Sequence, residues 1–229
     1  MDWWPYVYDL NMVSVALRLT LAMIFGGIVG FERGSKRRAA GLRTHMLVCV
    51  GSALVMITSK YIAFNLPFAS DPARLGAQVI SGIGFLGAGT ILVTSYNQVR
   101  GLTTAAGLWA SACLGLAIGI GFYGGALIAG ILILFIIAVL HNIDAALITK
   151  SRNMEVYVEF GNDGKFSSLL SAANKNGIQI LNVVFTHSKL SSTDPLAALV
   201  SMHLPKRRNH NEVVEMLAKV EGILYIHEV

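Results

Sequence analysis

Polar residues lie inside otherwise apolar stretches of this sequence, where each of them needs a physical reason. Arg18 falls about eight residues into the first apolar stretch, and a charge at that depth costs about 2.5–3.5 kcal/mol on insertion scales. One interpretation is that Arg18 lines a pathway or pairs with an acid inside a bundle. The other is that it is a structural strut that bonds to carbonyl groups, and the sequence favours neither.

A second polar stretch combines hydrogen-bonding side chains with many glycines. Gln78 and Ser81 are three residues apart and so share one face of a helix, and Thr90 closes the stretch. The glycines between them are Gly82, Gly84, Gly87 and Gly89. A helix broken at these glycines would expose backbone dipoles that coordinate ions. We favour close helix packing, because glycine is enriched where membrane helices meet.

A third group of polar residues lies where apolar stretches begin or end. Its members are Glu32, Arg33, Arg43, Thr44, His45, Thr103 and Thr104. Hydroxyl groups at a helix start cap free amide groups, and the positive end of the helix dipole favours an anion. The group is therefore a candidate site for a partner, a lipid headgroup or an ion. Ordinary capping and topology signals explain part of it without any function.

Residue sets typical of catalysis or metal binding are not evident. His141 and Asp144 are three residues apart, but two candidate ligands do not make a metal site, and a hydrogen-bonded junction is the preferred interpretation. We predict no metal site and no cofactor. Because the sequence shows no Ser-His-Asp, Cys-His or paired-carboxylate arrangement, we also predict that the protein is not an enzyme.

The composition separates the chain into two unequal parts. Of the 229 residues, 54% are hydrophobic and 14% are charged, whereas soluble domains carry about 25% charged residues. Residues 1–150 contain ten Lys/Arg against five Asp/Glu, and residues 151–229 contain eight of each, so the net charge of +5 belongs to the apolar part. These basic residues lie in short loops, so we do not expect nucleic-acid binding.

Residues 1–150 are predicted to form a membrane bundle of about five helices in the lipid bilayer. Each apolar stretch is near the ~20 residues that cross a bilayer, and the predicted spans are about 10–31, 45–64, 75–93, 103–120 and 123–148. Basic residues between Arg33 and Arg43 place that loop in the cytosol. The N-terminus is then outside, as is the loop that contains Asp71 and Arg74, and the C-terminal part is cytosolic.

Residues 151–229 are predicted to form a small α+β domain. Apolar and polar residues alternate from Met154 to Phe160, which is the period of a half-buried strand. The strands and helices that follow give the order β-α-β-β-α-β of ferredoxin-like and ACT-like folds. Asn162, Asp163 and Gly164 form a turn that is either a ligand site or, as we prefer, a plain capped turn.

Four motifs together resemble the MgtC/SapB family of bacterial inner-membrane proteins. They are Gly27-Ile-Val-Gly-Phe-Glu-Arg33, Ala40-Gly-Leu-Arg-Thr-His45, the stretch from Ala77 to Thr90, and Val99-Arg-Gly-Leu-Thr-Thr-Ala-Ala-Gly-Leu-Trp109. The resemblance adds Arg100 and Trp109 to the cytosolic group and Arg74 to the family-type polar residues. Some members, including the virulence type, have Asn before Val-Arg-Gly where this chain has Gln98, so the resemblance is to a general SapB-like membrane protein.

The resemblance implies a regulatory membrane protein linked to magnesium homeostasis and to growth in acidic or low-magnesium surroundings. The expected partner is another membrane protein such as the ATP synthase, and a homodimer through the glycine-rich spans or the tail is a further hypothesis. The expected location is the bacterial inner membrane. The alternative function is a transporter or channel for an ion or small solute, which would use Arg18, Gln78 and Ser81.

Overall fold

The computed structural model describes residues 7–65, 71–94, 98–140, 151–161, 166–187, 196–206 and 209–228. The chain divides into two compact units, Met1–His141 and Asn142–Val229. The two are described separately below.

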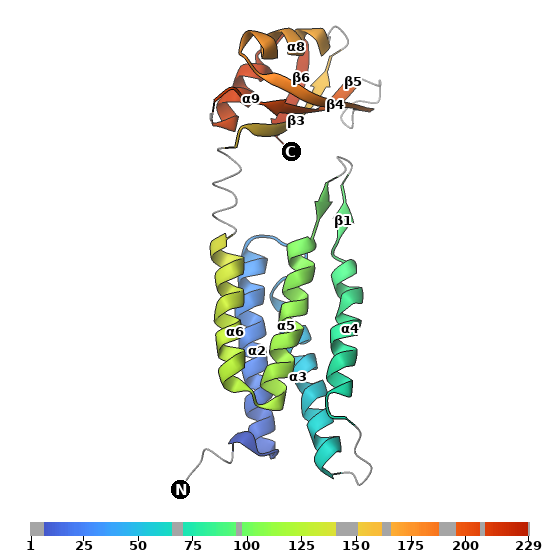
Figure 1. The fold of residues 1–229 in the computed structure, drawn as a ribbon, viewed down its shortest axis with the longest axis vertical. Helices are drawn as coiled ribbons and strands as arrows, with labels where there is room; N and C mark the ends of the chain where they lie inside the picture. The colour runs from blue at the N-terminus through green and yellow to red at the C-terminus, as the bar shows by residue number, and fades with distance from the viewer. Residues whose placement is uncertain are drawn as a thin grey trace. The chain divides into compact units, whose positions relative to one another are not determined.

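The first unit is a bundle of antiparallel helices. It contains α2 (Met12–Ser35), α3 (Leu42–Asn65), α4 (Arg74–Ala88), α5 (Leu102–Ile120) and α6 (Tyr123–Phe135), and α6 continues as the π-helical turn η1 (Ile136–Leu140). Successive helices run in opposite directions (Figure 1). Among the described residues, α2, α3, α5 and the combined α6–η1 segment are long and apolar enough to cross a membrane. The chain is thus a multi-helix membrane protein, as predicted.

The predicted span 75–93 differs from the structure. Helix α4 has 15 residues, or about 22 Å at 1.5 Å per residue, which is short for ~30 Å of hydrocarbon. It ends at Ala88, with Gly89 as its C-cap, after which β1 (Leu92–Val93) pairs with β2 (Val99–Arg100) in a short antiparallel ladder. The helix is continuous through Gly82, Gly84 and Gly87, so a break within the glycine stretch is not observed.

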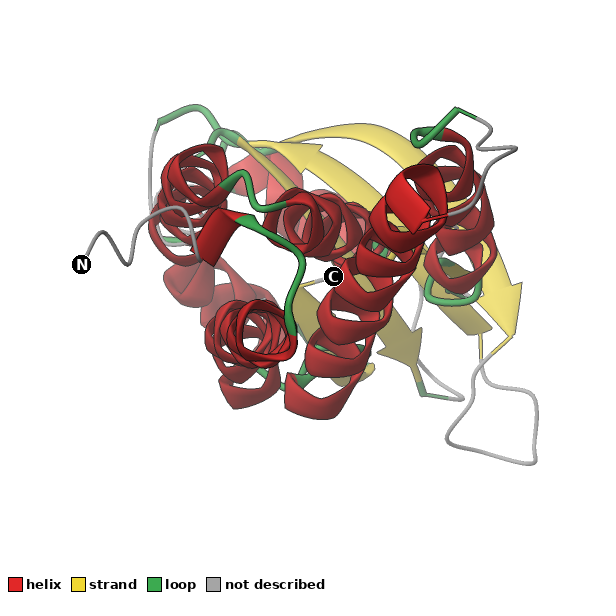
Figure 2. Cartoon of the chain, turned by 90° about the horizontal axis from the view of Figure 1, so that it is seen from below, coloured by secondary structure: helices red, strands yellow, loops and turns green. Residues whose placement is uncertain are grey.

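Helix α3 packs between α2 and α5 through glycine contacts, and the helices are seen end-on in Figure 2. A Cβ at Gly26 would lie 2.7 Å from the His45 carbonyl oxygen, and one at Gly115 would lie 2.2 Å from the Cys49 carbonyl oxygen. Both distances are below van der Waals contact, so only glycine permits these approaches.

The second unit has the predicted order of elements. It contains β3 (Asn153–Phe160), α8 (Phe166–Lys175), β4 (Gln179–His187), β5 (Leu196–His203), α9 (His210–Ala218) and β6 (Ile223–Glu228). The strands form one antiparallel sheet in the order β4-β5-β3-β6. Its core joins Val156 and Val200 of the central strands to Leu169 of α8 and Leu217 of α9, so both helices cover the same face of the sheet.

Truncation of Val200 to alanine should destabilise the second unit by about 2 kcal/mol, because the side chain is fully buried in that core and its removal leaves a cavity. The matched control is Val184→Ala on β4, where valine is half exposed and the expected cost is below about 0.5 kcal/mol. The loss of stability in each of the two variants is measured by hydrogen exchange of the β3 and β5 amides in the full-length protein. Equal exchange rates in the two variants would contradict the assigned core.

Candidate functional site

Arg18 forms hydrogen bonds to three chain segments at one end of the bundle: the segment before α2, the end of α5 and the start of α6. Its side chain is fully buried, and Nη1 donates to the Gly119 carbonyl oxygen at 2.8 Å. Nε donates to the Tyr123 hydroxyl at 3.1 Å, and Nη2 donates to the Tyr8 carbonyl oxygen at 2.9 Å. A guanidinium with several neutral acceptors is stabilised by charge-assisted hydrogen bonds. This geometry supports the structural interpretation of Arg18.

Arg18 lies near one end of its helix. It is in the second turn of α2, level with the end of α5 and the start of α6. Gly121 turns the chain there with φ +94°, and a Cβ on it would lie 3.1 Å from Arg18 Nη2. Lys60 donates to the same Tyr8 carbonyl oxygen at 3.0 Å. This end of the bundle is therefore a junction between chain segments.

The opposite end of the bundle holds a second buried arginine. Arg33, in the last turn of α2, is 4% exposed, and its Nη2 donates to Thr104 Oγ1 in the first turn of α5 at 3.0 Å. The neighbouring Glu32 pairs with Lys36 at 2.6 Å. Arg33 Nε is buried and has no hydrogen-bond partner within the described chain. Arg33 and Thr104 are thus two predicted site residues that the fold brings together.

His45 forms another polar contact between the helices. Its ring is fully buried, and Nδ1 lies 2.9 Å from Ser111 Oγ on α5. Nε2 is buried and makes no hydrogen bond to any described residue. Ser111 was not predicted from the sequence, although it lies seven residues after Thr104, two helical turns along one face.

The remaining members of the predicted cytosolic group do not join this cluster. The residues Arg43, Arg100, Thr103 and Trp109 are exposed, and Thr44 is half-buried. Among the residues that the structure describes, Arg100 Nη2 contacts only Gln98 Oε1, at 3.5 Å. From members of the predicted group, the structure thus forms two buried contacts, Arg33 with Thr104 and His45 with Ser111, and leaves the other basic members exposed.

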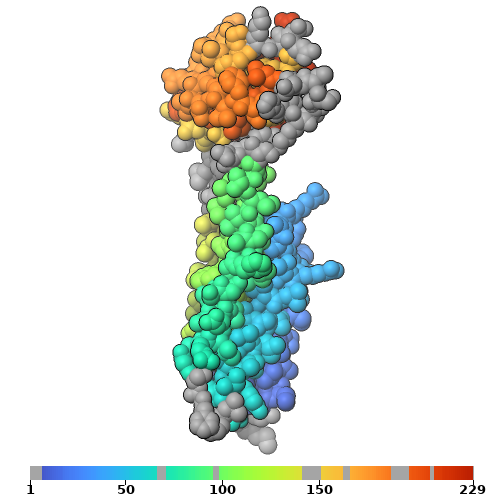
Figure 3. Space-filling view, turned by 90° about the vertical axis from the view of Figure 1, so that its right-hand side faces the viewer, coloured from blue at the N-terminus to red at the C-terminus, as the bar shows by residue number. Residues whose placement is uncertain are grey.

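Helix α4 carries polar residues that face away from the rest of the chain. Gln78 and Ser81 are exposed, and neither side chain makes a hydrogen bond within the described residues. Figure 3 looks onto the α4 side of the bundle, drawn in teal and green. Thr90 donates to the Gly87 carbonyl oxygen at 2.8 Å and so closes the helix end. At the other end Arg74 and Asp71 are exposed, and Asp71 Oδ1 accepts from the Ala73 amide at 2.8 Å.

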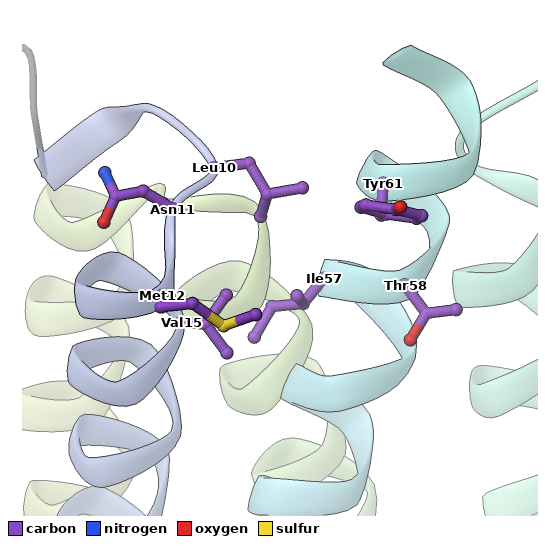
Figure 4. Close-up of a pocket in the computed structure, with 7 residues that line it drawn as sticks. All are labelled: Leu10, Asn11, Met12, Val15, Ile57, Thr58 and Tyr61. Atoms are coloured by element: carbon purple, nitrogen blue, oxygen red, sulfur yellow. The ribbon is translucent and has the colours of Figure 1, made fainter. Parts of the chain in front are cut away.

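An apolar groove of about 400 Å³ separates the start of α2 from the last turns of α3 (Figure 4). Its lining residues are Leu10, Asn11, Met12, Val15, Ile57, Thr58 and Tyr61. Leu10 and Ile57 point into the space between the helices, whereas Asn11 points away. The Asn11 side chain accepts from the Ser14 amide and caps α2. The groove thus offers little polar recognition.

The second unit contains a buried polar pair on the sheet. Tyr157 Oη donates to Glu159 Oε1 at 2.6 Å, and both residues are 2% exposed. The predicted turn residues Asn162, Asp163 and Gly164 lie outside the described residues, as do His141 and Asp144. Over the described residues of both units, no group of three or more His, Cys, Asp or Glu side chains is placed to hold a metal ion.

Comparison with known proteins matches this sequence to a family. The family model described as "MgtC family" matches residues 19–146. Protein SapB of Bacillus subtilis (strain 168) is 31% identical over 219 residues, which cover 92% of this chain and 93% of that protein. "Putative magnesium transporter YhiD" of Escherichia coli (strain K12) is 42% identical over 150 residues, 64% of this chain and 69% of that protein. Protein MgtC of Brucella abortus (strain 2308) is 43% identical over 129 residues, 56% of this chain and 52% of that protein.

Proposed function

Because the chain belongs to the MgtC family, we propose that it is a non-enzymatic regulatory protein of the bacterial inner membrane that acts by binding another membrane protein. Its regulatory role is linked to magnesium homeostasis and to growth in low magnesium or acid. The observation that carries this proposal is the exposed face of α4, which combines two polar side chains with open glycines.

The α4 face has the properties of a surface that receives a partner helix. An exposed amide such as that of Gln78 is costly against lipid tails and gains hydrogen bonds from a polar group on a neighbouring helix. A Cβ on Gly82 or Gly84 would meet no atom within 4 Å, so another backbone has room to approach closely. Phe85, which is 84% exposed, supplies a large apolar contact beside them.

The proposed occupant is a transmembrane helix of a partner protein, and the family resemblance suggests a subunit of the ATP synthase. Gly82→Leu fills the open space on α4, so we expect at least about a fivefold loss of partner during co-purification from the native membrane. Gly124→Leu is the matched control, because Gly124 on α6 also has no atom within 4 Å of its Cβ position.

The proposal is supported if the wild-type and Gly124→Leu proteins retain ATP synthase subunits and the Gly82→Leu protein loses them. Equal retention by the two variants would exclude the α4 face as the docking surface.

Transport is the second candidate function, and the name of the Escherichia coli relative favours it. Purified protein in liposomes separates the two functions. Flux of magnesium or another solute that Gln78→Ala abolishes supports the transporter. The regulatory proposal predicts no flux above that of protein-free liposomes.

The proposed topology places the second unit in the cytosol as an ACT-like domain. The basic residues at the end of α2 and before α3 support this orientation by the positive-inside rule, and the β-α-β-β-α-β order supports the fold assignment. Protease should remove the second unit in inside-out vesicles and leave it intact in right-side-out vesicles. Calorimetry of the full-length protein with amino acids tests whether the unit binds a ligand.

A further inference from the structure

Arg33 is a buried cation that makes no ion pair with any described residue. The adjacent Glu32 attracts its guanidinium only at longer range and pairs with Lys36 instead. Within the described residues, its one side-chain partner is the neutral Thr104 hydroxyl, and its Nε–H donor has no partner. A buried charge in this state is costly unless an anion accompanies it.

The first turn of α5 adds further donors at the same place. Its N-cap is Gly101, which has φ +98° and no side chain with which to cap the helix, and the first turn carries no acidic residue. The first amide groups of a helix have no partner within the helix and form the positive end of its dipole. Thr104, which accepts from Arg33, lies in this turn, so the guanidinium and the free amides are close together.

The start of α3 reinforces the same positive end of the bundle. Gly30 of α2 packs against the first turn of α3, and a Cβ on Gly30 would lie 2.7 Å from Leu42 Cα. Because Gly30 is three residues before Arg33, the start of α3 contacts α2 about one helical turn from Arg33. This first turn also lacks an acidic residue. Other exposed basic side chains lie near these helix ends in the sequence: Arg37, Arg38 and Arg100. All of these features attract negative charge.

We propose that a phosphate group binds at this end of the bundle, where the Arg33 guanidinium and the first-turn amides of α5 can both donate to it. A phosphate offers several acceptor oxygens that match both the forked guanidinium and the amides of a helix N-terminus. The neighbouring Leu102, Thr103 and Gly34 are exposed, so the site adjoins the surface. The phosphate comes either from the headgroup of an anionic phospholipid or from soluble phosphate. This inference is independent of the proposed regulatory function.

The test uses the full-length protein, purified in detergent and stripped of lipid. Separate titrations add short-chain phosphatidylglycerol, the phosphatidylcholine analogue, or inorganic phosphate, with potassium chloride at equal ionic strength as the control. Bound ligand is measured by native mass spectrometry and by the shift in the unfolding temperature. We expect saturable binding of one phosphate compound, weakened about tenfold or more by Arg33→Gln.

Two variants make the test specific to Arg33. Arg43→Gln removes one exposed charge from the same end of the bundle and should change binding less than about twofold, because exposed charges are screened. Arg33→Lys keeps the charge but removes the Nε–H donor, so it should weaken binding by about threefold. This variant still tests the site if Arg33→Gln fails to fold.

The phosphatidylglycerol and phosphate titrations distinguish the two sources. Saturation by phosphatidylglycerol alone identifies a lipid headgroup, and saturation by inorganic phosphate identifies a soluble ligand. The proposal is overturned if neither compound saturates the wild-type protein, or if the Arg33 variants bind as Arg43→Gln does.

Discussion

Gly115→Ala is expected to lower the stability of the membrane bundle by about 3 kcal/mol, since overpacking of this kind forces backbone shifts. The added Cβ would lie 2.2 Å from the Cys49 carbonyl oxygen and 2.9 Å from Ser52 Cβ. The nearest atom belongs to the backbone of α3, so no side-chain rotation relieves the overlap. Helices α3 and α5 would have to separate. Gly119→Ala, at 2.4 Å from the Ala53 carbonyl oxygen, should behave in the same way.

The matched control for Gly115→Ala is Gly82→Ala on α4, where the added Cβ meets nothing within 4 Å. There alanine only improves helix propensity, and the expected effect is neutral or a gain of up to about 1 kcal/mol. The midpoint of thermal unfolding in detergent, followed by size-exclusion chromatography, measures both variants. A loss in Gly82→Ala as large as that in Gly115→Ala would show that glycine flexibility, and not close packing, stabilises the bundle.

These two glycines show what the sequence alone could and could not predict about the bundle. From the sequence we favoured close helix packing at the glycines from Gly82 to Gly89, whereas the structure leaves Gly82 and Gly84 open and shows the tightest approaches elsewhere, as at Gly115. The sequence could not separate Gly115 from Gly82, because both lie in apolar stretches beside small residues. The difference depends on which helix lies opposite, which is a property of the tertiary arrangement.

Tertiary packing also limited the prediction of the site, and local hydropathy limited the prediction of the third span. Arg33 and Thr104 were predicted as members of one group, but their contact depends on the packing of α2 against α5. Ser111 was missed because a lone serine in an apolar helix gives no local signal.

Hydropathy extended the predicted third span to residue 93, since Ile91, Leu92 and Val93 are as apolar as a helix core. In the structure α4 ends at Ala88.

The second unit was easier to predict because its strands carry a clear alternation of apolar and polar residues. The expected strand from Met154 to Phe160 is β3, and its apolar residues face the helices. Tyr157 and Glu159 are the exception. They belong to the polar side of the alternation, yet the structure buries both and joins them by a hydrogen bond.

Arg18→Met is expected to destabilise the bundle by about 3 kcal/mol or more, because it removes charge-assisted hydrogen bonds and leaves buried acceptors without donors. The Gly119 and Tyr8 carbonyl oxygens both accept from Arg18, so α2, the end of α5 and the segment before α2 would lose a shared contact. Methionine has a similar length and apolar stem, which limits the loss of packing itself. The unfolding midpoint in detergent measures the effect.

Arg43→Met is the control for the Arg18 substitution, because Arg43 is exposed and its removal should cost less than about 0.5 kcal/mol. The comparison also separates the two interpretations of Arg18. A strut predicts a large loss of stability for Arg18→Met, whatever its effect in a flux assay. A pathway residue predicts near-normal stability together with a change in solute flux in liposomes. Because the Arg18 guanidinium bonds to carbonyl and hydroxyl groups of three segments, the first result is the one that we expect.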